Sequence, residues 1–373
     1  MFLDALEDSW PQSPQASLAR RILPDLMRLG PVRLTANADV ELRAWQAGDQ
    51  VLPIVLRKHD GASRIAAICS PWLHYVRYPL GELDRHGRGF GALFRRGLLY
   101  ASIPFLRVSN IDQVVWVNNW LITTNPQPTL DRAEIERLTD TLRKQYPRHA
   151  IVFRTVNPEV NQEFATDLVA CGYRLVASRT VYLLDPASRE YRRNKDVRLD
   201  RNLLHRGDYE ILPHEALSPA DMPRVAELHR LLYMEKHSVL NADYSPLFFE
   251  TAWRNRFLEF RALRRQGRID AYTASFALGD LMTACLVGYD TRLPRKLGLY
   301  RRSIALIMEE SRRNGLRLNL SAGAGEFKYH RGARPCVEYD AVFDRHLPLH
   351  RRAGWSLLKA AGSYQDRKVR RKW

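Results

Sequence analysis

The spacing of hydrophobic positions along this chain switches repeatedly between the period of a strand and that of a helix. In the first half, alternating polar and apolar residues predict strands at 32–34, 41–47, 51–58, 114–124, 150–156 and 174–184. Apolar positions three and four residues apart predict helices at 17–29, 130–146 and 159–171. Residues 82–97, rich in glycine and arginine around Phe90 and Phe94, are expected to form a surface loop. The order of strands and helices is typical of an α/β fold.

The same order returns after residue 208. Strands are predicted at 208–212, 258–263, 269–278, 281–290, 316–320 and 336–343, and helices at 218–236, 298–314, 327–332 and 347–364. Ser218 and Asp221 have the spacing of an N-cap and its capping-box partner. We therefore expect a first domain at 1–188, a basic connecting helix at 189–207 and a second domain at 208–373. That helix either is solvated or contacts phosphate.

Composition places the chain among globular proteins. Its 373 residues suit two domains, and the hydrophobic share of 45% is ordinary. No apolar run approaches the roughly 18 to 20 residues of a spanning helix, and the start MFLDALEDSW is acidic where a signal peptide is basic. We expect a cytoplasmic protein without a membrane span. The four cysteines, Cys69, Cys171, Cys285 and Cys336, lack zinc-ligand spacing, so no metal site is expected.

The net charge of +17 is unevenly distributed. Residues 189–373 contain 36 Lys and Arg against 22 Asp and Glu, or +14, which leaves +3 for residues 1–188. Such asymmetry suggests a partner that carries phosphates, whether a nucleotide, coenzyme A, tRNA or an anionic membrane surface. A basic surface that serves only solubility is the alternative.

The helix that begins near Gly298 is the candidate anion site. A helix N-terminus presents free N–H groups and a partial positive charge, and five cations surround this one. The cations are Arg292, Arg295, Lys296, Arg301 and Arg302.

The strand that follows this helix ends in small residues at 321–325, where a backbone can approach a ligand closely. Phe327 and Lys328 come next, at the strand end where ligands collect in open α/β sheets. Alternation in the last strand predicts that Glu338 and Asp340 share a face. The turn after residue 232 is either ordinary loop packing or an acceptor-recognition loop. Its polar and aromatic members are Tyr233, Lys236, His237, Asn241 and Tyr244.

The stretch GLYR…SAGAGEFKYHRGA…EY resembles the C-terminal half of tandem GNAT acyltransferases, in the group of FemAB-like peptidyltransferases and BioF2-like acetyltransferase domains. The likeness covers about residues 208–345 and reaches the first half only as architecture. It implies two tandem GNAT-like domains, each a mostly antiparallel twisted sheet flanked by helices. The first half shows no evident nucleophile with a partner base, so we expect it to be a non-catalytic copy, either inactive or one that grips the acceptor. The Arg/Gln-x-x-Gly-x-Gly/Ala loop of ordinary GNAT enzymes is kept only at its first glycine, Gly298.

The resemblance implies an N-acyltransferase that forms an amide, with acyl-CoA as the donor, an amine on a small molecule or peptide as the acceptor and no permanently bound cofactor. Lys328 is expected to stabilise the oxyanion, Glu338 to act as base through water, and Tyr289 or Tyr329 to protonate the leaving group. The donor is expected to contact Arg295, Lys296, Gly298, Leu299, Tyr300, Arg301 and Arg302. The substrate is expected to contact Ser321, Phe327 and the five residues of the turn.

Two alternatives remain open at this point. The first is a FemAB-like transferase that takes its acyl group from aminoacyl-tRNA, which the +14 charge of residues 189–373 also suits. The second is a catalytically dead GNAT pair that acts as an RNA-binding or scaffold protein.

Overall fold

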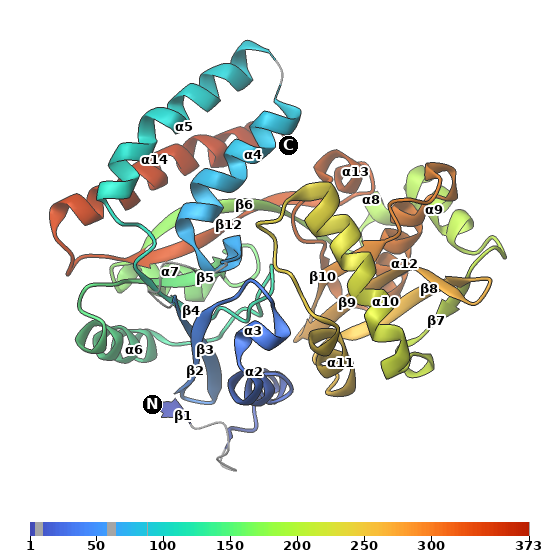
Figure 1. The fold of residues 1–373 in the computed structure, drawn as a ribbon, viewed down its shortest axis with the longest axis horizontal. Coiled ribbons are helices and arrows are strands. Elements are labelled where there is room, and N and C mark those ends of the chain that lie inside the picture. The colour runs from blue at the N-terminus through green and yellow to red at the C-terminus, as the bar shows by residue number, and fades with distance from the viewer. Residues whose placement is uncertain (4–9, 58–64, 88, 373) are drawn as a thin grey trace.

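The structure is a computed structural model that describes residues 1–3, 10–57, 65–87 and 89–372, with side chains omitted at 86 and 364–372. The described residues form one mixed α/β unit in which helices flank a 12-stranded, mostly antiparallel sheet (Figure 1). The strand order is β1-β2-β3-β4-β5-β12-β6-β11-β10-β9-β8-β7. The strands are β1 (Phe2–Leu3), β2 (Val40–Ala47), β3 (Gln50–Arg57), β4 (Val114–Val117), β5 (Ala150–Val156), β6 (Arg174–Leu184), β7 (Glu210–Leu212), β8 (Glu259–Arg265), β9 (Arg268–Leu278), β10 (Leu281–Tyr289), β11 (Arg317–Asn319) and β12 (Arg334–Phe343).

The two halves exchange strands at the centre of this sheet. Strand β12, from the end of the chain, pairs with β5 of the first half, and β6 of the first half pairs with β11 of the second. The long β12–β6 ladder, from Arg334 opposite Leu183 to Val342 opposite Arg174, joins the halves. Side chains from β6 are therefore brought next to the second half's strand ends. The domain limits at 188 and 208 stay a prediction.

Helices cover both faces of the sheet. The first half contributes α1 (Pro14–Arg20), α2 (Leu23–Leu29), α3 (Pro31–Leu34), η1 (Ala67–Cys69), η2 (Leu73–Arg77), α4 (Tyr78–His86), α5 (Phe90–Val108), α6 (Arg132–Gln145) and α7 (Gln162–Ala170). The remainder contributes α8 (Arg189–Arg192), α9 (Lys195–Leu204), η3 (His214–Ala216), η4 (Pro219–Asp221), α10 (Met222–His229), η5 (Arg230–His237), α11 (Pro246–Arg254), η6 (Arg295–Leu297), α12 (Leu299–Arg313), α13 (Gly325–Tyr329) and α14 (Leu349–Lys372). Helix α14 packs on β6, and α5 lies alongside α14 (Figure 1).

Several expected elements are confirmed and others are wrong. The strands at 150–156 and 174–184 and the capping box of Ser218 and Asp221 are present as predicted. Residues 32–34 belong to helix α3 instead of a strand, because Pro31 at the first helical position fixes a helical φ. The predicted strand at 114–124 ends at Val117, since Asn118 takes a left-handed φ of 59°. The described residues of the expected loop at 82–97 lie largely in α4 and α5, because Phe90, Leu93 and Phe94 have the three- and four-residue spacing of a helix despite the glycines.

Candidate active site

A gap opens in the sheet between β10 and β11. The two strands pair in parallel only at Leu281–Thr283, and β10 then bulges between Ala284 and Leu286 and continues to Tyr289. Since β11 ends at Asn319, the second part of β10 separates from it. A gap of this kind lets an extended ligand reach backbone groups that would otherwise be hydrogen-bonded within the sheet.

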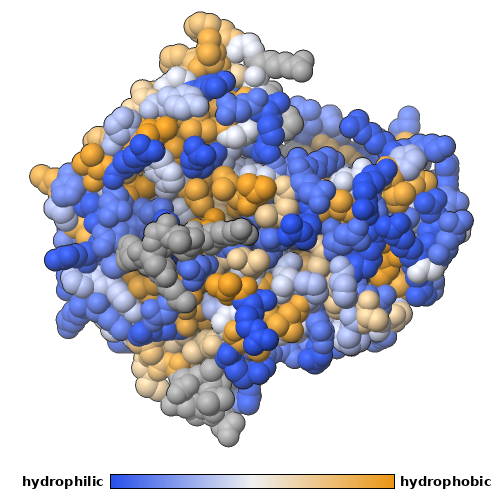
Figure 2. All heavy atoms as spheres, viewed as in Figure 1, coloured by the Kyte–Doolittle hydropathy of each residue, from blue (hydrophilic) through white to orange (hydrophobic). Residues whose placement is uncertain are grey.

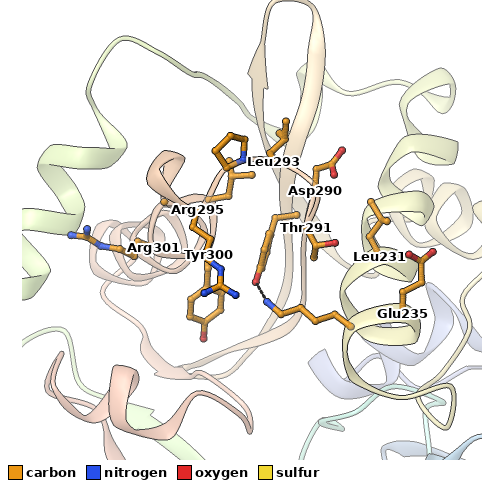
Figure 3. A pocket seen from close by; sticks show the side chains of 13 residues that line it. Leu231, Glu235, Asp290, Thr291, Leu293, Arg295, Tyr300 and Arg301 are labelled. Atoms are coloured by element: carbon orange, nitrogen blue, oxygen red, sulfur yellow. Dashed lines mark hydrogen bonds between the residues drawn. The ribbon is translucent and has the colours of Figure 1, made fainter. Parts of the chain in front are cut away.

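A cavity of about 590 Å³ lies beside this gap, at the N-terminus of α12 (Figure 3). Its volume falls within the range of small-molecule sites. The residues that line it are Leu231, Glu235, Lys236, Tyr289, Asp290, Thr291, Leu293, Pro294, Arg295, Gly298, Leu299, Tyr300 and Arg301. Gly298 is the N-cap of α12 with a left-handed φ of 63°, and among the described residues no side chain caps this helix end. The first N–H groups of α12 therefore have no side-chain acceptor in the described part of the chain. Two carboxylates, those of Glu235 and Asp290, also line the cavity, and the carboxylate of Asp290 is neutralised by three arginines, Arg224, Arg268 and Arg292.

The expected cluster of five cations is only partly at this helix end. Arg295 and Arg301 both line the cavity. The side chain of Arg301, however, points away from Glu235 in Figure 3, and its Nε donates to Asp200 of α9 at 2.6 Å. Arg302 is buried and donates to the carbonyls of Leu297 and Leu204. Arg302 therefore holds helix α12 against its neighbours and is not available to the donor, contrary to the prediction. The remaining two cations, Arg292 and Lys296, lie outside the cavity lining.

A line of aromatic rings leads from the cavity to α13. Lys236 Nζ donates to the hydroxyl of Tyr289 at 2.7 Å and also lies 5.2 Å from the centre of that ring (Figure 3). The ring of Tyr300 is 6.2 Å from that of Tyr289 and 5.0 Å from that of Phe327. Burial raises the pKa of Tyr300. Because the hydroxyl of Tyr289 accepts a bond from Lys236, its own proton can be donated to a ligand.

Lys328 lies on α13, is 3% exposed and turns its ammonium group toward the turn that follows β11. Its Nζ donates to the carbonyls of Leu320 at 2.7 Å, Ser321 at 3.2 Å and Ala322 at 2.8 Å. Burial, with a smaller effect of Arg179, lowers the pKa of Lys328 to about 7. All three ammonium protons are therefore used to hold the turn after β11, and an oxyanion would have to displace one of these carbonyls.

A chain of polar contacts runs from this turn to Glu338. Ser321 Oγ lies 2.8 Å from Thr124 Oγ1, and Arg179 donates to Thr124 Oγ1 at 2.7 Å and to Glu338 Oε2 at 2.8 Å. Glu338 is fully buried, and its Oε1 has no hydrogen-bond partner among the described residues. A buried carboxylate oxygen without a partner is costly, so this atom is a candidate to receive a substrate proton.

Asp340 lies nearby in a second buried cluster. It accepts a bond from the hydroxyl of Tyr75 at 2.7 Å, and burial raises its pKa against the opposing charge of Arg154. His74 lies 2.8 Å from Ser178 Oγ, and burial lowers the pKa of His74 to about 3, so that its imidazole is neutral near pH 7.

Left-handed backbone conformations concentrate around these clusters. Leu121, Thr155 and Ser321 have φ values of 58°, 56° and 57°. A β-branched residue such as Thr155 rarely adopts this conformation, and such strain persists mainly at functional sites.

The other predicted residues are distributed differently. Tyr244 is 1% exposed and donates to the carbonyl of Leu121, which gives it a place in the core instead of a substrate contact. Asn241 caps the carbonyls of Tyr233 and Ser238, and burial raises the pKa of Tyr233 to about 12. His237 packs against Tyr233, with ring centres 6.3 Å apart.

Tyr329 lines a second cavity of about 770 Å³ with Cys336 and Tyr339, away from the cavity at α12. Burial raises the pKa of Cys336 to about 12, which argues against a reactive thiolate there. Within the described residues no group of three or more His, Cys, Asp and Glu side chains is arranged to hold a metal ion.

Sequence reasoning missed Thr124 and Arg179, because both belong to the first half and only the exchange of β6 and β12 brings them to Glu338. The one available signal was Arg179 itself, a charged residue between Ser178 and Thr180 in the middle of the strand predicted at 174–184. No helix among the described residues is long and apolar enough to cross a bilayer.

Comparison with known proteins identifies part of the chain. The family model described as an acetyltransferase (GNAT) domain matches residues 190–331. No curated protein matches the chain in sequence.

Two solved structures share its fold at 13% identity: the C-terminal domain (DUF2156) of a putative lysylphosphatidylglycerol synthetase from Agrobacterium fabrum and L-PGS from Bacillus licheniformis. The alignment with the first covers 94% of this chain and 91% of that structure's chain, with a TM-score of 0.51. The alignment with the second covers 95% of this chain and 99% of that structure's chain, with a TM-score of 0.50. A structure of FemX is also similar, at 8% identity, 83% and 89% coverage and a TM-score of 0.49.

Proposed function

We propose that this chain, in which residues 190–331 match the acetyltransferase (GNAT) domain family, transfers an acyl group from acyl-CoA to an amine and so forms an amide. The family match over residues 190–331 supports acyl transfer, and the donor and the acceptor are our inference. The observation that carries the choice of donor is the cavity at the uncapped N-terminus of α12, next to the gap between β10 and β11.

The donor would bind along this gap. Its pyrophosphate would accept bonds from the first N–H groups of α12 and from Arg295, because a helix N-terminus favours anions. A Cβ at Gly298 would lie 2.8 Å from Leu203 Cδ2, so the left-handed glycine keeps this end both open and close to α9. The pantetheine arm would then follow β10 toward Lys328 and Glu338.

In the reaction, the amine nitrogen attacks the thioester carbon, the new C–N bond forms and the C–S bond breaks. Glu338 Oε1 accepts the amine proton, directly or through water, while Arg179 fixes the other oxygen of the carboxylate. Tyr289 gives its proton to the leaving thiolate, and Lys236 stabilises the resulting phenolate.

Lys328 has two roles in this proposal. Its ammonium holds the carbonyls of residues 320–322, which keeps Ser321 against Thr124. When substrate binds, Lys328 exchanges one of these carbonyls for the developing oxyanion and stabilises its charge.

Aminoacyl-tRNA is the second candidate donor, favoured by the +14 charge of residues 189–373. Thermal unfolding with coenzyme A and a mobility shift with charged tRNA separate the two. We expect coenzyme A to raise the unfolding midpoint, by an amount that grows with the logarithm of its concentration once that exceeds Kd. No shift with coenzyme A, together with a tRNA complex that weakens steeply with salt, would replace our donor by the alternative.

A further inference from the structure

Helix α5 exposes an apolar face to solvent, and no other described part of the chain covers it. Its exposed large side chains include Phe90 at 83%, Leu93 at 65%, Phe94 at 64% and Leu98 at 60%. Phe105 and Val108 are exposed as well. With about 200 Å² for each aromatic side chain, the three phenylalanines alone expose about 380 Å², which already reaches the size of the largest patch of a typical monomer.

These side chains form a single stripe. At about 100° per residue, Phe90, Leu93, Phe94, Leu98, Phe105 and Val108 span roughly 140° of the helix circumference. The opposite side, with Ala92 and Leu106, is buried against the protein. A surface helix that only supports a core turns its apolar stripe inward, whereas α5 turns its stripe toward solvent.

Arginines mark both edges of the stripe. Arg95 lies on one edge, and Arg96 and Arg107 lie on the other. Arg96 is held by Asp84 at 3.3 Å, and the guanidinium of Arg107 is 5.4 Å from the ring centre of Trp72. These contacts keep the charged ends beside the apolar face, the geometry in which basic side chains reach lipid phosphates while their stems stay in the apolar layer.

The surrounding charge has the sign that an anionic surface requires. Residues 72–108 contain six arginines against two acidic residues, or +4, while the first half as a whole carries only +3. The sequence of α14, which packs beside α5, contains eight basic residues against one acidic residue. Figure 2 shows orange residues along the upper edge of the molecule, over α5, interspersed with blue ones.

We propose that α5 is a membrane-docking helix that lies in the surface of an anionic lipid bilayer, with its apolar stripe in the acyl boundary and its arginines at the phosphates. Acidic groups do not oppose this contact: Glu82 and Asp84, on α4, are paired with Arg85 and Arg96. Helices α4 and α5 follow η2 in the chain, and Tyr75 of η2 donates to Asp340 of β12. Docking of α5 would therefore fix the orientation of the sheet relative to the membrane.

Flotation of the full-length protein with vesicles tests the proposal. We expect binding to vesicles of equal parts phosphatidylcholine and phosphatidylglycerol, weaker binding to phosphatidylcholine alone, and loss of the difference at high salt. The double variant F94S/L98S should reduce the bound fraction at least about tenfold, and R95Q/R96Q should reduce binding to anionic vesicles alone.

The matched control is V169S/L199S, which replaces two comparably exposed apolar residues elsewhere and should bind as the wild type does. Light scattering on wild type and F94S/L98S gives the other decisive readout. Absence of wild-type flotation, equal flotation of F94S/L98S, or a wild-type dimer that this variant makes monomeric would overturn membrane docking, the last in favour of a contact between copies. Unchanged thermal unfolding of F94S/L98S shows that the variant is folded.

Discussion

Helices α6 and α12 occupy equivalent positions in the two halves but end in opposite ways. Each connects two strands that pair in parallel, β4 with β5 and β10 with β11. The N-terminus of α6 is closed by a capping box, in which Asp131 accepts from the N–H of Glu134 at 2.7 Å and Glu134 accepts from the N–H of Asp131 at 3.0 Å. The N-terminus of α12 has a left-handed glycine and a cavity instead.

This difference assigns the two halves separate tasks. Two carboxylates at the start of α6 satisfy its N–H groups and repel a phosphate, so this end serves stability. The open end of α12 has lost that stabilisation and is free to bind an anion. The first half nevertheless contributes to the site through β6, since Arg179 holds Glu338.

The largest expected effect concerns Glu338. The variant E338Q should lower kcat about a hundredfold or more, because general-base catalysis contributes on that scale, while binding of coenzyme A stays near the wild-type value. Steady-state kinetics and calorimetric titration measure the two quantities.

Asp344→Asn is the matched control for this variant. Asp344, just beyond the end of β12, is also a buried carboxylate with one unpartnered oxygen among the described residues, and it pairs with Arg174 at 2.8 Å as Glu338 pairs with Arg179. An equal loss of kcat in D344N and E338Q would mean that buried charge, and not proton transfer, explains the effect.

The second prediction concerns Lys328. K328A should lower turnover more than about tenfold with the fold retained, as expected for a lost oxyanion donor. Near-normal turnover would remove this role.

The pH dependence of stability gives an independent test of Lys328. The unfolded lysine keeps its proton up to its ordinary pKa of 10.5, whereas the folded one loses it above about 7. Between these values the unfolded state binds more protons, so the free energy of unfolding rises with pH. Urea unfolding of wild type and K328M should show the wild type gaining relative to the variant from pH 7 to 9, and a parallel pH dependence would contradict the lowered pKa.

Much of the second half was predictable from the sequence because its signals are local. Gly298 before an amphipathic run marks the start of α12, and Ser218 with Asp221 marks a capping box. The contacts of Thr124 and Arg179 depend on the exchange of β6 and β12, a long-range pairing that leaves no periodic trace. Helix α5 was missed because its glycines suggested a loop, although its apolar spacing was helical all along.

A smaller effect is expected when α12 is closed in the manner of α6. G298D puts a carboxylate in front of the first N–H groups and should weaken coenzyme A binding at least about tenfold. Aspartate tolerates the left-handed conformation better than most residues, and Leu203 Cδ2, 2.8 Å from the new Cβ, is the end of a flexible side chain that can move, so the fold should survive. G315D, at the left-handed glycine after the other end of α12, is the control and should bind normally. If G298D bound coenzyme A with unchanged affinity, the N-terminus of α12 would not be part of the donor site.

The smallest effect is expected at α6. D131A removes the cap and should lower the free energy of unfolding by about 1 kcal/mol, while D131N, which keeps an acceptor oxygen, should stay near the wild type. Both should leave coenzyme A affinity unchanged, because the donor is expected at α12 alone. Urea unfolding and calorimetric titration measure these quantities. If D131A restored coenzyme A binding to the G298D protein, the first half would hold a latent donor site and the division of tasks between α6 and α12 would fail.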